Sequence, residues 1–339
     1  MAAPLDDRAL RSVHLELLGR PPFASERETW LGGRADELVA TLLGGLSCWE
    51  HWVQEQLWYF LLVGNFRPAS EGVHDLPGAL ASRRLSALEA LHRIALSPAF
   101  DLRNPGADTF VTVVLEQITG TNVQKQAREL ELGKRAYDGA RALFLGRPAA
   151  SQSDVVRVAI ESERAVRHLI AREHERILRR PPEPAALAAW TRELSREPLR
   201  FPELVAEWLA SPAWSDRGAA GAPLSNRSFV RALFVDLFDA LPEAAEAEAM
   251  RSALDSLADP RPLRSVLARL LLDSGSVPLP AREDVPDPTL FVADLFRRLL
   301  GREARQSELA EFVRAYHASE GRIETLLLAL LSHPAYHQY

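Results

Sequence analysis

The chain has 339 residues, of which 47% are hydrophobic and 25% charged, so a wholly disordered protein is excluded and more than one compact unit is expected. The 40 lysine and arginine residues against 46 aspartate and glutamate residues give a net charge of −6, which argues against a protein that binds nucleic acid. Cys48 is the single cysteine, which excludes an intrachain disulfide and a metal site built from cysteine pairs.

The sequence shows no membrane span and no export signal. Its longest apolar stretch, residues 57–64, is much shorter than the roughly 20 residues that a helix needs to cross a bilayer. The first residues are acidic and lack the basic and apolar regions of a secretory signal. We therefore expect a cytoplasmic protein without a membrane span.

Four segments of the chain share one pattern of apolar residues. In each, an apolar residue lies nine residues before a fixed position, a histidine or phenylalanine lies five before it, and a large apolar residue lies eleven after it. These offsets hold without gaps in all four segments, which indicates an internal repeat. The fixed positions are Gly19, Arg179, Asp239 and Gly301.

Each repeat is predicted to form three short helices. The first helix is amphipathic, as the three- and four-residue steps between Val292, Leu295 and Leu299 illustrate. Gly19 and Gly301 fit the left-handed position that ends such a helix.

The second and third helices of each repeat also have recognisable ends. Ser25, with Glu28 three residues later, forms a capping-box pattern, and Ser307 is the predicted N-cap of the corresponding helix in the last repeat. The third helix is apolar and stops at a closing motif whose aromatic residue, Trp214 or Tyr336, is expected to fold back onto the core. No segment alternates β-branched residues over a useful length. The predicted fold is all-α, an array of divergent three-helix repeats with a helical insertion.

The repeats define the predicted domain organisation. A partial copy of the pattern surrounds Leu143 and marks a truncated repeat. The predicted units are repeat 1 over 8–52, a helical insertion over 53–132, the truncated repeat over 133–166, repeat 2 over 167–218, repeat 3 over 227–277 and repeat 4 over 288–339.

The insertion carries the candidate interaction surface. Aromatic residues crowd its first helix, where they indicate either a small core or an interface. Polar residues then gather around an otherwise apolar helix over 104–122, which indicates a site or, more simply, a solvated helix face. Glu116 has the chemistry of an acid–base group but lacks a second carboxylate partner. The candidate surface comprises Trp58, Tyr59, Phe66, Asp108, Glu116, Gln117 and Asn122.

The remaining reactive side chains favour structural roles. His14 and His174 occupy the position that Phe234 and Phe296 hold in the other repeats, so packed histidines are predicted. Cys48 stands in a closing motif and is predicted to be a buried thiol. The sequence contains no glycine-rich phosphate loop, no serine-nucleophile motif and no zinc-protease motif. We predict no catalytic residue, no cofactor and no metal ion.

Two parts of the chain resemble known helical families. The sequence Leu15-Glu16-Leu17-Leu18-Gly19-Arg20-Pro21-Pro22, with the later Trp49-Glu50-His51-Trp52, resembles a helical domain of unknown function that is widespread in planctomycete-type bacterial proteins. Residues 229–238 and 290–302 resemble the start of short helical repeats in bacterial surface and secreted proteins and, more loosely, of phycobilisome-linker domains. These resemblances imply a helical module and no particular chemistry.

The functional hypothesis is a non-catalytic helical repeat scaffold or adaptor that mediates protein–protein interactions in a bacterial assembly. Its partner is a protein of unknown identity and not a nucleic acid. Two alternatives stay open. One is an enzyme or ligand-binding subunit with its site in the segment 53–138, and the other is a structural subunit of a self-assembling array.

Overall fold

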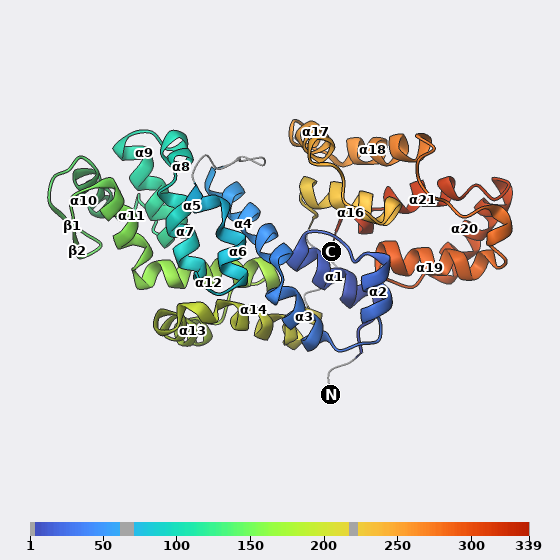
Figure 1. Ribbon diagram of the computed structural model, residues 1–339, viewed down its shortest axis with the longest axis horizontal. Coiled ribbons are helices and arrows are strands. Elements are labelled where there is room, and N and C mark those ends of the chain that lie inside the picture. The colour runs from blue at the N-terminus through green and yellow to red at the C-terminus, as the bar shows by residue number, and fades with distance from the viewer. Residues whose placement is uncertain (1–3, 62–70, 217–222, 339) are drawn as a thin grey trace. The chain divides into compact units, whose positions relative to one another are not determined.

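The computed structural model describes residues 4–61, 71–216 and 223–338, and their regular secondary structure is almost entirely helical (Figure 1). Within these residues, β-structure is limited to one antiparallel pair of short strands and two isolated bridges. The predicted all-α class is therefore confirmed. No described helix combines the length and apolar character that a membrane crossing requires.

The chain forms two compact units, and each is described separately. Unit 1 comprises Met1–Val39 and Arg217–Tyr339, and unit 2 comprises Ala40–Asp216. The boundary lies within α3 (Ala35–Gly44), so it divides the first predicted repeat. The other elements of unit 1 are α1 (Asp7–Leu18), α2 (Ala24–Trp30), α16 (Asn226–Phe238), α17 (Ala244–Asp255), α18 (Arg261–Asp273), η3 (Arg282–Asp284), α19 (Pro288–Leu300), α20 (Gln306–Ala318), α21 (Ile323–Leu331) and η4 (Pro334–His337).

Unit 2 contains the predicted insertion and the second predicted repeat. Its elements are α4 (Leu46–Leu61), α5 (Glu71–His74), α6 (Leu76–Ala81), α7 (Ala87–Ala95), α8 (Pro98–Arg103), α9 (Gly106–Val113), the π-helix η1 (Val114–Ile118), α10 (Ala127–Tyr137), β1 (Ala142–Phe144), β2 (Arg147–Ala149), α11 (Gln152–Ile160), α12 (Glu163–Leu178), α13 (Pro184–Arg196), η2 (Pro198–Arg200), α14 (Phe201–Ala210) and α15 (Pro212–Ser215).

The first helices of the four predicted repeats end in the same way. Gly19 (φ 63°) and Gly301 (φ 61°) adopt the left-handed conformation that was predicted for them. Arg179 (φ 58°) and Asp239 (φ 52°) do so as well, although a side chain makes this conformation less favourable. Three helices follow one another at matching places in each of these segments, while the repeat relationship itself stays a prediction.

The start of α2 differs from the prediction. The helix begins after Phe23, whose backbone N–H donates to Glu26 Oε2 at 2.8 Å. Arg20 donates to both oxygens of the same carboxylate, at 2.6 and 2.8 Å. The predicted cap at Ser25 is therefore wrong, because a glutamate in the first turn satisfies the free N–H group instead.

The start of α20 has the same arrangement. Glu308 accepts from the backbone N–H of Arg305 at 2.8 Å and pairs with both terminal nitrogens of Arg302. The predicted cap at Ser307 is wrong for the same reason. This ion pair holds the pKa of Glu308 at about 2, so the carboxylate is charged at all ordinary pH values.

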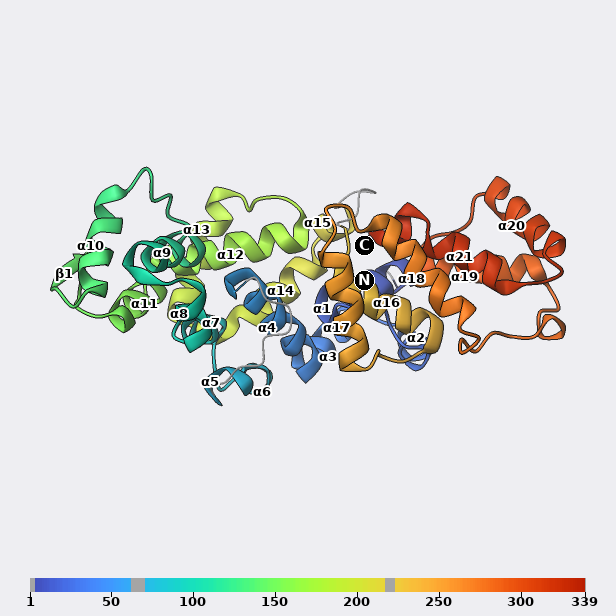
Figure 2. The same cartoon turned by 90° about the horizontal axis from the view of Figure 1, so that it is seen from above.

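The predicted truncated repeat contains a β-hairpin. β1 and β2 are joined by Leu145 and Gly146, and both residues have positive φ (48° and 77°), as a two-residue type I′ turn requires. Glu129 accepts from the backbone N–H of Leu145 at 2.9 Å. The partial copy of the repeat pattern around Leu143 thus forms a hairpin turn, whereas the same pattern ends a helix in the four repeats. In two perpendicular views the hairpin and α10 lie at one end of unit 2 (Figures 1 and 2).

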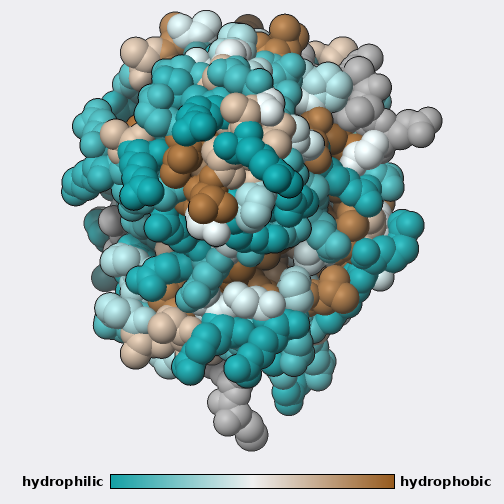
Figure 3. All heavy atoms as spheres, turned by 90° about the vertical axis from the view of Figure 1, so that its left-hand side faces the viewer, coloured by the Kyte–Doolittle hydropathy of each residue, from teal (hydrophilic) through white to brown (hydrophobic). Residues whose placement is uncertain are grey.

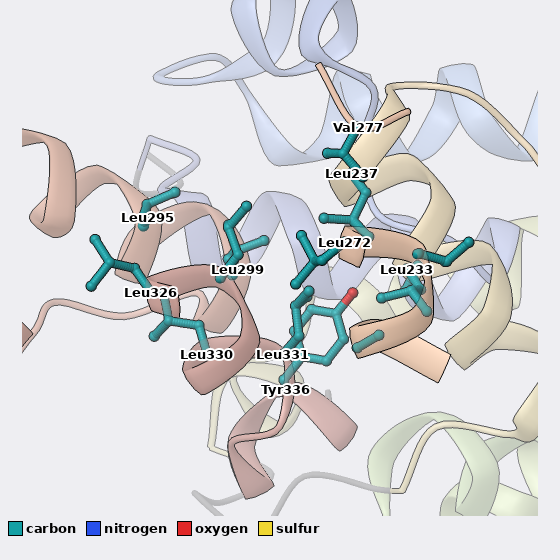
Figure 4. Packing of buried hydrophobic residues seen from close by; sticks show 14 of the residues in the cluster. Leu233, Leu237, Leu272, Val277, Leu295, Leu299, Leu326, Leu330, Leu331 and Tyr336 are labelled. Atoms are coloured by element: carbon teal, nitrogen blue, oxygen red, sulfur yellow. The ribbon is translucent and has the colours of Figure 1, made fainter. Parts of the chain in front are cut away.

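Each unit has its own apolar core. In unit 1, side chains of α16, α18, α19 and α21 converge, and the ring of Tyr336 packs beside Leu331 (Figure 4). In unit 2, a series of edge-to-face and tilted ring contacts joins Phe60, Phe100, Phe110 and Tyr137. The closing aromatics Trp214 and Tyr336 are both buried, as predicted.

Candidate binding groove

A groove of about 1000 Å³ opens on the surface of unit 2. Three places far apart in the sequence build it: the start of α7, the junction of α11 and α12, and the end of α13 with η2. Its volume is at the upper end of the range that is usual for ligand sites. The lining residues are Arg84, Ser86, Leu88, Glu89, His92, Arg157, Ile160, Glu161, Glu163, Val166, Arg192, Leu194, Ser195, Arg196, Pro198 and Leu199.

Local sequence signals place the helix ends that form the groove. Ser86 caps α7 and shares a capping box with Glu89. Ser162 caps α12 by accepting from the backbone N–H of Ala165 at 3.2 Å. Pro198 lies two residues after the end of α13 and opens η2. The chain therefore changes direction at each of these three places.

The floor of the groove is apolar and its lip is partly so. Leu88, Ile160, Val166 and Leu194 are buried and contribute the floor. Leu199 stands at the lip with 44% of its surface exposed. An exposed leucine beside a hollow with an apolar floor offers an anchor for an apolar side chain of a partner.

Three guanidinium groups at the groove carry no carboxylate partner among the described residues. Arg84 bonds only to the hydroxyl of Ser82, at 3.0 Å, and Arg192 reaches only a carbonyl of its own helix, at 3.4 Å. Arg196 makes no hydrogen bond or ion pair within the described part of the chain. Glu193, three residues earlier on the same helix, pairs with Arg200 instead. The groove therefore presents positive charge that the fold does not neutralise.

The carboxylates of the groove are largely engaged within the protein. Glu89 accepts from the backbone N–H and the hydroxyl of Ser86, at 2.7 and 2.8 Å. Glu161 pairs with Arg147 at 2.6 Å and with Arg157 at 3.5 Å. Glu163 is the first residue of α12, where a negative charge is favourable next to the helix N-terminus.

His92 adds a neutral polar group to the groove. Burial lowers its pKa below the ordinary value, so the imidazole is uncharged at neutral pH. Its Nε2 atom is buried and has no hydrogen-bond partner within the described residues. The groove thus combines apolar contacts, unpaired guanidinium groups and an imidazole, which suits a partner with carboxylate and apolar side chains.

The candidate surface predicted from the sequence lies elsewhere in unit 2, and none of its described residues lines the groove. The structure brings two of them together: the hydroxyl of Tyr59 donates to the carbonyl of Gln117 at 3.4 Å, and Arg172 lies over the Tyr59 ring. Trp58 is 42% exposed, whereas Trp52 of the same helix is buried. Phe66 lies outside the described residues.

The other predicted surface residues have local roles. Asp108 is exposed and pairs with Lys134 at 3.0 Å, and Asn122 accepts from the backbone N–H of Lys125 at 3.1 Å. Glu116 is exposed on the π-helix η1. The side of unit 2 that carries α10 and the hairpin is mainly hydrophilic, with small separate hydrophobic areas (Figure 3). The interaction role of these residues stays a prediction.

The reactive side chains that the sequence assigns to structural roles are buried. His14 lies within hydrogen-bonding distance of the Leu10 carbonyl, at 2.9 Å, and His174 of the Arg180 carbonyl, at 3.0 Å. Burial raises the pKa of the Cys48 thiol to about 12, so the unreactive thiol form prevails. Among the described residues, no three His, Cys, Asp or Glu side chains gather as a metal site would require.

Sequence reasoning missed the groove residues, although one local signal points to them. Arg192 and Arg196 are four residues apart on α13, and like charges at this spacing are locally unfavourable in a helix. Such a pair is easier to explain when both side chains face an opposite charge from outside. Arg84 and Leu199 have no comparable signal.

Comparisons with known proteins give no indication of function, so the functional argument depends on the groove. No family model matches the chain, and no curated protein or solved structure is significantly similar to it.

Proposed function

We propose that this chain is a non-catalytic helical adaptor that binds a partner protein through the groove of unit 2. The observation that carries the proposal is the combination, in one open groove, of an apolar floor, an exposed leucine and guanidinium groups that have no carboxylate partner in the described part of the chain. Protein interfaces concentrate binding energy in such central apolar anchors with arginine nearby. The bacterial setting suggested by the resemblances belongs to the same proposal.

Differential affinity purification tests the adaptor function. The full tagged chain, its Leu199→Glu variant and a Leu102→Glu control are incubated with lysate of the source cells, and bound proteins are quantified by mass spectrometry. Leu102 is 84% exposed on α8 and does not line the groove, so the control introduces the same charge elsewhere on unit 2. We expect a stoichiometric partner to bind the wild type and the control but not Leu199→Glu. Identical protein sets from all three baits would contradict the proposal.

A ligand-binding subunit is the second candidate. One wall of the groove, from Arg84 to His92, lies in the segment 53–138 where the sequence analysis places such a site, and His92 Nε2 lacks a partner among the described residues. Native mass spectrometry of the purified chain distinguishes the two functions. A bound small molecule that disappears in Leu199→Glu favours the ligand-binding subunit, and its absence favours the adaptor. Light scattering of the same sample tests self-assembly.

A further inference from the structure

We propose that the groove recognises an extended acidic segment of the partner, with carboxylates on alternate residues and an apolar side chain between them. This inference rests on the proposed adaptor function and specifies the partner's chemistry. Its basis is charge complementarity between the groove's unpaired arginines and the segment's carboxylates.

The spacing of the arginines indicates how the carboxylates are arranged. Arg192 and Arg196 are one helical turn apart, which places their Cα atoms about 6 Å apart along the axis of α13. Alternate residues of an extended chain are about 6.6 Å apart and point to the same side. A Glu-x-Glu segment therefore presents two carboxylates at nearly the spacing of the two guanidinium groups.

The groove's own carboxylates do not cancel this preference. Glu89 and Glu161 already accept hydrogen bonds or ion pairs from the protein. Glu163 is the one remaining carboxylate among the lining residues, against the three unpaired guanidinium groups. His92 adds no charge at neutral pH because burial keeps it deprotonated. The charge of the groove that the protein does not neutralise is therefore positive, and an acidic segment is attracted to the three unpaired arginines.

The apolar part of the groove selects against a purely ionic ligand. The side chain between two carboxylates points to the opposite side of an extended segment, away from the arginines of α13. When it is apolar, it gains contact with the apolar residues that α7 and α11 contribute to the groove, such as Leu88 and Ile160. Nucleic acid fits less well, because it offers no aliphatic anchor and the chain as a whole carries a charge of −6.

Fluorescence anisotropy with defined peptides tests the proposal on the full chain. The probe is a fluorescein-labelled peptide with the core Glu-Leu-Glu-Leu-Glu; the comparison peptides replace Glu by Gln or Leu by Ser. We expect the probe to bind, both comparison peptides to bind at least tenfold more weakly, and added salt to weaken probe binding. Two further measurements complete the experiment: direct binding of a labelled oligothymidylate, and competition of inorganic phosphate with the bound probe. Equal binding of oligothymidylate, or full displacement of the probe by millimolar phosphate, would overturn the assignment to an acidic peptide.

Variants locate the binding to the groove. Arg192→Gln with Arg196→Gln should weaken probe binding at least tenfold, while Arg128→Gln with Arg135→Gln should leave it within about twofold. The control arginines are exposed on α10, outside the groove, and likewise form no ion pair with the described residues. Because all four side chains are exposed, both double variants are expected to fold.

A charge reversal, together with the purification experiment, distinguishes failure of the acidic-segment proposal from failure of the adaptor proposal. Arg192→Glu with Arg196→Glu should lose the acidic probe and gain binding of a Lys-Leu-Lys-Leu-Lys peptide. If neither of the two double variants of Arg192 and Arg196, to Gln or to Glu, changes probe binding, the proposal is wrong. If Leu199→Glu still loses its cellular partner in that case, the adaptor function stands and only the partner's acidic character is refuted.

Discussion

Arginine has opposite surroundings in two regions of this protein. In unit 1, Arg11 is buried and donates to Asp236 at 3.0 and 2.8 Å and to the carbonyl of Arg298 at 3.0 Å, while the hydroxyl of Tyr336 donates to the same aspartate at 2.8 Å. At the groove of unit 2, Arg196 makes none of these contacts within the described residues. The first arginine is paired within the fold, and the second is one of those for which we propose a partner outside the chain.

The titration behaviour of the unit 1 network agrees with a structural role. Burial opposes the charge on Arg11, yet the neighbouring Asp236 carboxylate keeps its pKa above the ordinary value. Burial and the same carboxylate raise the pKa of Tyr336 well above its ordinary value. Arg11 therefore stays charged and Tyr336 stays neutral at ordinary pH. The two regions therefore differ in what their arginines contribute: the paired, buried Arg11 stabilises the fold, whereas the exposed arginines of the groove carry the proposal of a binding site.

The largest effect is expected when the unit 1 network is broken. Asp236→Ala leaves the Arg11 guanidinium buried without its counter-ion, and we expect the free energy of unfolding of unit 1 to fall by about 3–5 kcal/mol. Denaturant unfolding followed by circular dichroism, together with amide hydrogen exchange in α1 and α16, measures this loss.

A double variant serves as the control for that change. Arg11→Met with Asp236→Leu removes both charges, so no buried ion remains unpaired and most of the stability should return. If Asp236→Ala costs less than about 1 kcal/mol, the network does not hold unit 1 together and the comparison with the groove fails.

A pH effect of intermediate size is expected in unit 2. Burial, with a smaller contribution from Arg172, lowers the pKa of His168 to about 4. In the unfolded chain this histidine titrates near its ordinary value, so it takes up a proton below about pH 6.5, whereas in the folded chain it stays neutral until the pH approaches 4. The stability is therefore full above about pH 6.5 and falls as the pH drops toward 4. Because His168 is only partly buried, we discount the effect to about 1–2 kcal/mol between pH 7 and pH 4.

Tryptophan fluorescence during urea unfolding measures this dependence, since most tryptophans lie in unit 2. His168→Asn cannot take up the proton, so its stability should fall less between pH 7 and pH 4 than that of the wild type. Parallel pH profiles for the two proteins would show that His168 does not cause the acid sensitivity.

A smaller effect, an increase in stability, is expected from a substitution in the hairpin turn. Leu145 has a positive φ, which is unfavourable for leucine and well suited to asparagine before Gly146. We expect Leu145→Asn to raise the free energy of unfolding of unit 2 by about 0.5–1 kcal/mol. Leu143→Asn, at an exposed strand position with ordinary backbone geometry, is the matched control and should give no gain. Equal effects of both substitutions would refute the turn argument.

The helices were predictable from the sequence because their signals are local. The apolar stripe of α19 and the left-handed ends at Gly19 and Gly301 depend on neighbours within one or two turns. The burial of aromatic residues in α4 was predictable only in part. Trp52 and Trp58 are six residues apart, so helix periodicity places them on different faces of α4. Which of these faces is buried depends on the tertiary packing, and the fold buries Trp52 and exposes Trp58.

The candidate site was harder to predict because no local pattern encodes it. Residues 84–92, 157–166 and 192–199 form the groove only after three helix ends come together. The apolar residues of its floor look like any other core residues in the sequence. The like-charge pair on α13 was the available hint, and its meaning depends on a tertiary arrangement that helix periodicity does not provide.

The smallest effect on stability is expected at the groove itself, and its sign is informative. Arg192→Gln with Arg196→Gln removes two like charges one turn apart, so we expect no loss and a gain of about 0.2–0.5 kcal/mol in the free energy of unfolding of unit 2, measured by tryptophan fluorescence. The Arg128→Gln with Arg135→Gln control lacks this spacing and should stay unchanged. A loss above about 1 kcal/mol would mean that the groove arginines stabilise the fold as Arg11 does. The distinction between the two regions requires the opposite: the variant that loses the partner must be at least as stable as the wild type.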